Sequence, residues 1–350
     1  MLSTAPLRAS DARFLAIPLM PLLTAWGLWT NPGYSAAITM MVAVLIALLD
    51  LAWPGAQRSP APAAHAVPHP ALQWLLRLYV PLQMGLIALG AWVAVQGSWG
   101  LVLGVAFTVG FVTGAQGITM AHELGHSRSK LDRALGWLLM CSVGYGHFMV
   151  EHYRGHHPRA ATLDDPASAR WGESLWRFLP RTLLGSWRSA WQLEALRIAR
   201  FKLSWLRSPL LWSVAANALL VAVLLVLGSY TILFFWCFQA AYAVWLLESI
   251  NYIEHYGLAR SSSATGQREA FGLQHAWNAD HVLSNSLLAN LQRHSDHHMH
   301  ATKPWPTLAA LPGPQLPTGY SGCIFLATVP PLWFAAMHPR LEKLSMLQKI

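Results

Sequence analysis

Six apolar stretches divide this sequence, and each is close to the length that a bilayer requires. About 20 predominantly apolar residues in a helix cross the hydrocarbon core of a membrane. The pattern therefore predicts an all-α, polytopic membrane protein with about six transmembrane helices. The predicted spans are roughly 14–30, 36–54, 73–96, 99–121, 208–228 and 230–250.

Two further apolar segments are predicted to pack without crossing the membrane. Segment 134–150 lies between histidine-rich motifs, and we expect it to form a buried or re-entrant helix. Segment 322–337 contains the pair Pro330-Pro331, which argues against a straight spanning helix, so a packed or interfacial element is expected there. The Pro- and Ala-rich stretch 61–70 is typical of a linker.

The distribution of Lys and Arg predicts the orientation of the spans. The short links 31–35, 96–100 and 228–230 contain none of the 24 Lys and Arg residues, most of which fall in regions 121–207 and 251–350. Because Lys and Arg are retained on the cytoplasmic side, both termini and these two regions are expected there. The two regions would form a cytoplasmic, histidine-rich helical cap on a single domain, 1–350, in a bacterial-type inner membrane.

Composition agrees with the membrane assignment and excludes other classes. Only 11% of residues are charged, against about 25% in soluble domains, and 54% are hydrophobic. The 18 Trp residues suit membrane–water interfaces. The formal charge of +9 follows the orientation pattern, so no nucleic-acid partner is expected. The three Cys residues are scattered and form no CxxC pair, which excludes a thiolate metal site.

The candidate chemistry lies in the 16 His residues, most of which are grouped. Each group falls at the expected cytoplasmic end of a span, so the groups can converge at one depth. Nine imidazoles exceed the four ligands that a zinc ion takes, and they suit two metals with four or five ligands each. Imidazole is compatible with Zn, Cu, Fe and Ni. The groups are "HELGH" (122–126), "EHYRGHH" (151–157), "NYIEHYG" (251–257) and "LQRHSDHH" (291–298).

The residues alone argue against two other function classes. "HELGH" is also a zinc-protease signature in which Glu123 would be the general base, but that function leaves seven of the nine clustered histidines unexplained. A metal transporter would need polar residues along the spans, and the first five contain almost none. Helical spacing places His122 with His126, and His152 with His156, on shared faces.

The three histidine motifs, in this order on an apolar chain, resemble the integral-membrane desaturase/hydroxylase superfamily. "NYIEHYGLAR" (251–260), the long second motif (154–181) and "LQRHSDHH" are similar to the membrane alkane 1-monooxygenases and their alkyl-aromatic relatives. The resemblance extends from about residue 120 to 340. It implies a non-haem diiron site with nine histidine ligands: His122, His126, His152, His156, His157, His255, His294, His297 and His298.

The resemblance also implies the reaction and its partners. One atom of O2 would enter a terminal C–H bond of an alkane or similar hydrophobic chain, and the other would leave as water after two electrons arrive. The donor would be a rubredoxin- or ferredoxin-type protein with its reductase, separate from this chain. The substrate would partition into membrane lipid. Alternatives within the superfamily are methyl hydroxylation of alkyl-aromatics, as in xylene-type monooxygenases, and fatty-acyl desaturation, although the HYG element favours hydroxylation.

Several polar residues in and beside the motifs are candidates for supporting roles. Ligating histidines commonly donate their second N–H to a carboxylate. Glu248, inside the sixth span, is a functional candidate because a carboxylate there is costly. Tyr153 and the "WNAD" stretch (277–280) depart from the family pattern. The candidate carboxylates are Glu123, Glu151, Glu254, Asp280 and Asp296. The additional histidines are His147, His275, His281 and His300, with His65, His69 and His338 expected on the surface or in linkers.

Overall fold

The chain folds into packed helices, as the apolar pattern predicts. The structure, a computed structural model, describes residues 7–53, 69–261 and 268–347. Within those residues there is no strand, only an isolated bridge between Asn278 and Gln315. Most of the linker 61–70, including His65, lies outside the described residues.

Six helices are long and apolar enough to cross a membrane, which confirms the predicted number. They cover Ser10–Thr30, Pro32–Ala52, Pro70–Ala94, Trp99–His126, Pro209–Val226 and Tyr230–His255. Within these spans the individual helices are α2 (Leu19–Thr30), α3 (Ser35–Ala52), α4 (Pro70–Ala94), α5 (Trp99–Val112), α6 (Ile118–His126), α11 (Pro209–Val226) and α12 (Tyr230–His255).

The other helices are shorter or more polar. A π-helical segment, η3 (Thr113–Gly117), joins α5 to α6, and a second, η4 (His152–His156), follows α8. The α-helices are α1 (Ala9–Ala12), α7 (Lys130–Ser142), α8 (Phe148–Glu151), α9 (His157–Arg159), α10 (Leu175–Arg200), α13 (Val282–Leu287), α14 (His294–Met299), α15 (Tyr320–Thr328) and α16 (Pro330–Leu347). The 3₁₀ turns are η1 (Arg13–Ala16), η2 (Pro32–Tyr34), η5 (Trp205–Arg207), η6 (Leu273–His275) and η7 (Trp305–Thr307).

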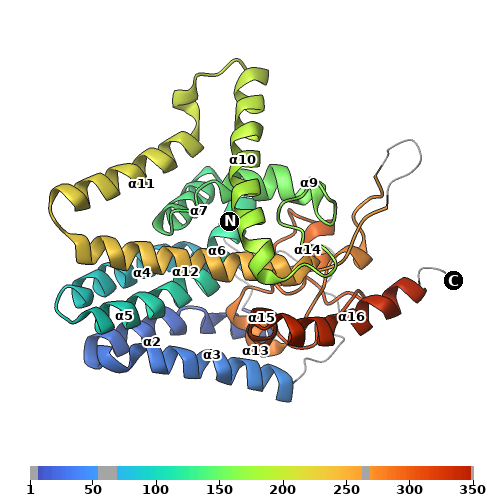
Figure 1. The fold of residues 1–350 in the computed structure, drawn as a ribbon, viewed down its shortest axis with the longest axis horizontal. Coiled ribbons are helices and arrows are strands. Elements are labelled where there is room, and N and C mark those ends of the chain that lie inside the picture. Colours follow the sequence, from blue (N-terminus) through green and yellow to red (C-terminus); the bar gives the residue numbers. More distant parts are fainter. Residues whose placement is uncertain (1–6, 54–68, 262–267, 348–350) are drawn as a thin grey trace.

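Helix α12 is the central element of the fold. It packs against α5, η3, α4, α10, α11 and α15, and Figure 1 shows α10 running across its direction. Phe235, near its start, lies in a cluster with α4 and α5 residues. Every residue from Leu246 to its end at His255 is buried. The second half of α12 is therefore an interior element, and it carries Glu248, Glu254 and His255 to the middle of the molecule.

The two shorter apolar segments pack against the spans, but 134–150 is not the single helix expected, because α7 ends at Ser142 and α8 begins at Phe148. Helix α7 begins before this segment, after Ser129, whose hydroxyl accepts a hydrogen bond from the N–H of Asp132. The Asp132 carboxylate also binds Arg77 of α4 at 2.7 Å, which ties α7 to the spans. In 322–337, α15 ends before Val329 and α16 begins at Pro330. Proline is tolerated at the first position of a helix, because the backbone N–H there has no partner within the helix.

Candidate metal centre

The nine clustered histidines meet inside the protein, where four segments that are distant in sequence converge. Helix α6 supplies two of them, the segment from η4 into α9 supplies three, the end of α12 supplies one and α14 supplies three. Their ring nitrogens form two groups, and within each group the atoms lie within 4.8 Å of one another. The five-histidine group is His122, His126, His152, His157 and His297, and the four-histidine group is His156, His255, His294 and His298.

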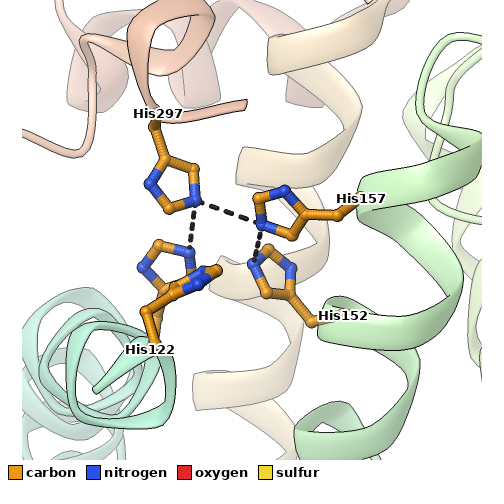
Figure 2. Close-up of side chains that lie close together, drawn as sticks. His122, His152, His157 and His297 are labelled. Atoms are coloured by element: carbon orange, nitrogen blue, oxygen red, sulfur yellow. Dashed lines mark hydrogen bonds between the residues drawn. The ribbon is translucent and has the colours of Figure 1, made fainter. Parts of the chain in front are cut away.

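Ring nitrogens of several members face each other at short distances within each group. In the five-histidine group, Nε2 of His297 lies 3.1 Å from Nε2 of His122 and 3.2 Å from Nε2 of His157 (Figure 2). In the four-histidine group, Nε2 of His294 lies 3.2 Å from Nε2 of His255. Such convergence of lone-pair-bearing nitrogens suits one central cation in each group.

The backbone of the second motif divides its histidines between the two groups. The rings of His152 and His156 stack with centroids 5.4 Å apart, as their helical spacing predicts. However, η4 is π-helical, and the N–H of His157 bonds to the carbonyl of His152. An i→i+5 turn brings residues five apart together. Accordingly, Nε2 of His157 lies 3.0 Å from Nε2 of His152, and His156 points into the other group. His156 and His157, which are adjacent in sequence, therefore belong to different groups.

Burial keeps most of these rings neutral, which is the form that binds metals. Desolvation, followed by the neighbouring rings, lowers the pKa of His152, His157, His294, His297 and His298 well below the ordinary value. Several ring nitrogens are buried without a hydrogen-bond partner, among them Nε2 of His126 and of His156 and both nitrogens of His298. Unpaired buried nitrogens are costly, and a metal ion would satisfy them. The donor set therefore fits two metal ions.

Three histidines direct their second nitrogen at a carboxylate. Nδ1 of His122 lies 3.0 Å from Oε1 of Glu123. Nδ1 of His294 lies 3.2 Å from Oε1 of Glu254, an ion-pair distance whose angle is too poor for a hydrogen bond. The third carboxylate, Asp165, lies 2.8 Å from Nδ1 of His156. The hydrogen bonds of His122 and His156 fix which nitrogen carries the proton and how the ring is oriented.

Asp165 was not among the sequence candidates. It follows the second motif in the loop 160–174, and it accepts a further hydrogen bond from Ser168 at 2.6 Å. Burial alone would raise its pKa, but the contact with His156 outweighs burial and lowers it. The same contact raises the pKa of His156 against the effect of burial. Its only sequence signal was an Asp-Asp-Pro step nine residues after His156.

Three of the candidate carboxylates bind cations instead of a clustered histidine. Glu151 pairs with Arg159 at 2.8 Å, and Asp280 pairs with Arg293 at 2.8 Å. Asp296 accepts from Lys303, His300 and the N–H of Ala309. In α14 a residue two positions from His294 and from His298 faces away from both. Burial raises the pKa of Glu151 to about 7.

Two other polar candidates hold the helices around the site. Glu248 is buried and accepts hydrogen bonds from Tyr145 at 2.7 Å, Thr182 at 2.8 Å and Asn251 at 3.2 Å, rather than pairing with an arginine. The Tyr153 hydroxyl donates to the carbonyl of His122 at 2.9 Å. Tyr153 thus departs from the family pattern in a way that braces α6.

The remaining histidines lie outside both groups. His147 is buried, and burial lowers its pKa to about 4. The carbonyl of His275 lies 3.0 Å from Nδ1 of His255, so His275 supports a clustered histidine through its backbone. Nε2 of His338 bonds to the Tyr256 hydroxyl, and His69 caps the start of α4. His338 is therefore packed rather than a plain surface residue.

Comparison with known proteins places the chain in a family. The fatty acid desaturase family matches residues 96–326, which include all nine clustered histidines. Alkane 1-monooxygenase 1 of Pseudomonas aeruginosa is 42% identical over 271 residues, covering 75% of this chain and 70% of that protein. The chain belongs to the fatty acid desaturase family and groups with its alkane 1-monooxygenases, which makes it an oxidoreductase of the monooxygenase class.

Two further relatives differ in how similar they are to this chain. Alkane 1-monooxygenase 2 of Pseudomonas aeruginosa is 38% identical over 341 residues, covering 94% of this chain and 90% of that protein. The xylene/toluene monooxygenase hydroxylase component XylM of Pseudomonas putida is 27% identical over 274 residues, covering 76% of this chain and 73% of that protein. The zinc-protease and transporter alternatives have no place in this family.

Proposed function

We propose that this chain hydroxylates the terminal carbon of alkanes or similar hydrophobic chains at a two-iron centre, using O2 and electrons from a separate rubredoxin- or ferredoxin-type protein. The observation that carries the proposal is the division of nine imidazoles into a five- and a four-membered group. The higher identity to the alkane enzymes, 42% against 27% for XylM, favours alkyl chains over alkyl-aromatics.

The nine histidines would hold the two irons, because imidazole is a suitable ligand for iron. Bound iron would supply the oxygen-activating redox chemistry that an unactivated C–H bond requires. The protein's own residues position the ligands and enclose the site. Burial favours the neutral form of most of the rings, the carboxylates Glu123 and Asp165 orient His122 and His156, Glu254 lies against His294, and the packed helices enclose the site.

Metal analysis of the purified protein tests the centre directly. We expect about two iron ions per chain, since the two groups offer five and four nitrogens. Prolonged chelation should remove the iron and the activity together, and iron(II) should restore both. One zinc and no iron per chain would contradict the diiron proposal.

We also propose that both termini lie in the cytoplasm. A reporter fused after Ser98, between α4 and α5, should read as periplasmic, because the link 96–100 contains no Lys or Arg. The same reporter fused after Ser204, between α10 and α11, serves as the control and should read as cytoplasmic. A cytoplasmic signal from the Ser98 fusion would overturn this topology.

A further inference from the structure

Two cavities adjoin on the membrane side of the histidines. The outer cavity, of about 380 Å³, lies between α3, α5, α12 and α15 and is lined by residues such as Met40, Phe107, Trp245 and Phe325. That volume is within the range of about 300–1,000 Å³ typical of ligand sites. The inner pocket, of about 20 Å³, is lined by His122 and other residues and reaches both histidine groups.

The outer cavity suits a hydrocarbon because four of the hydroxyl groups that line it already donate hydrogen bonds within the protein. Ser321 donates to the carbonyl of Ala43 at 2.8 Å, and Thr328 donates to the carbonyl of Phe325 at 2.7 Å. Tyr320 donates to Glu254 at 2.6 Å, and Ser284 donates to Asp50. A ligand with polar groups would find these four donors occupied, whereas an apolar chain loses nothing there.

Ile250 of α12 separates the two cavities. Its side chain lines both of them, and it is buried, one helical turn before Glu254. The neighbouring wall is closely packed, because a Cβ added to Gly114 of η3 would lie 2.7 Å from Cα of Ala243. Ile250 is the residue that the two linings share, so the direct route from the outer cavity to the histidines runs past its side chain.

The size of the inner pocket restricts what can reach the histidines. A volume of about 20 Å³ admits roughly one water-sized group, so a methyl group fits and an aromatic ring does not. In an unbranched alkane the terminal methyl is followed by slender methylenes, which can lie beside Ile250. In a methyl-arene the methyl is attached directly to a rigid ring, which would have to occupy the place of the Ile250 side chain.

We propose that Ile250 is a specificity-determining residue that passes the end of an unbranched alkyl chain to the histidines and excludes methyl-arenes. This proposal rests on the proposed function, and it adds the substrate shape and the residue that selects it. The outer cavity holds the body of the chain, and the inner pocket receives its terminal carbon.

Competition between n-octane and p-xylene in one reaction tests the proposal. The wild-type protein should form mainly octanol, and Ile250→Ala should shift the product ratio toward the benzylic alcohol by about 10-fold, the order expected when a hydrophobic pocket changes by a few methyl groups. Ile250→Val should give a smaller shift in the same direction. Ile198→Ala removes the same atoms from buried α10, far from both cavities along the chain, and should leave the ratio unchanged.

A binding measurement separates this proposal from the proposed function. Trp245 lines the outer cavity, so 1-bromooctane should quench its fluorescence, measured as the difference between wild type and Trp245→Phe. Ile250→Phe should keep this quenching and lose most octane hydroxylation. A wild-type preference for xylene, or an unchanged ratio in Ile250→Ala, would overturn the role of Ile250. Failure of the wild type to oxidise either compound would contradict the proposed function, and the quenching would still decide whether the cavity binds a chain.

Discussion

Replacing His255 with alanine is expected to abolish hydroxylation while leaving the protein folded in the membrane. His255 is the last residue of α12, fully buried, with Nε2 3.2 Å from Nε2 of His294. Its removal leaves three nitrogens in the four-histidine group. Changes to groups that merely support a ligand cost about 10–100-fold, so losing a ligand should cost more than about 100-fold in activity. Product formation, iron content and the amount of detergent-extracted protein measure the effect.

His300→Ala is the matched control, because His300 lies in the same motif as three clustered histidines. Its side chain is 56% exposed and lies outside both groups, on the Asp296 side of α14. Most of the activity and all of the iron should remain in that variant. Full activity in His255→Ala would remove His255 from the ligand set.

The spans were predictable because their signal is local. A run of about 20 apolar residues has one favourable arrangement in a bilayer, a helix that satisfies its own backbone groups. Where the spans end was less predictable, since helices continue beyond their apolar runs. The fourth span was expected to end near 121 but continues to His126, and the sixth was expected to end near 250 but continues to His255. Both extensions carry clustered histidines into the site.

The allocation of histidines between the two groups could not be read from spacing alone. Spacing assumes a regular α-helix, and η4 departs from it. A π-helical turn is held by its tertiary surroundings rather than by intrinsic propensity, so the motif "EHYRGHH" gives no local sign of it. In α14, His294 and His298, four residues apart, fall in one group, whereas His297, three residues after His294, falls in the other.

The carboxylate partners show a second limit of sequence reasoning. Adjacency in sequence selected Glu123 and Glu254, and each of them contacts a clustered histidine. The same criterion selected Glu151, which pairs with an arginine that follows it by eight residues. It missed Asp165, because the loop that returns this residue to His156 has no periodic pattern. Contacts made by loops depend on the whole fold and not on the motif that they support.

Asp165→Asn is expected to weaken metal binding at the four-histidine group by about 10–100-fold, the usual cost of removing a carboxylate that supports a ligating histidine. Asp165 holds His156 through a 2.8 Å contact with Nδ1, and its environment is fully buried. Asparagine keeps the size of the side chain but removes its charge and replaces one acceptor oxygen with an NH2 group, so the contacts that Asp165 makes with His156, Ser168 and the N–H of Ala167 cannot all be kept. Titration of the iron-loaded protein with a chelator, followed by iron analysis, measures the loss without relying on turnover.

The adjacent residue provides the control for this substitution. Asp164 is exposed and pairs with Arg268, so Asp164→Asn makes the same chemical change one residue away without touching a clustered histidine. It should release iron at the same chelator concentration as the wild type. Equal iron retention by Asp165→Asn and Asp164→Asn would show that the Asp165 contact does not support a metal ligand. Early iron release by Asp165→Asn alone would show that this loop carboxylate supports the metal centre. The support would act through His156, the clustered histidine that Asp165 contacts.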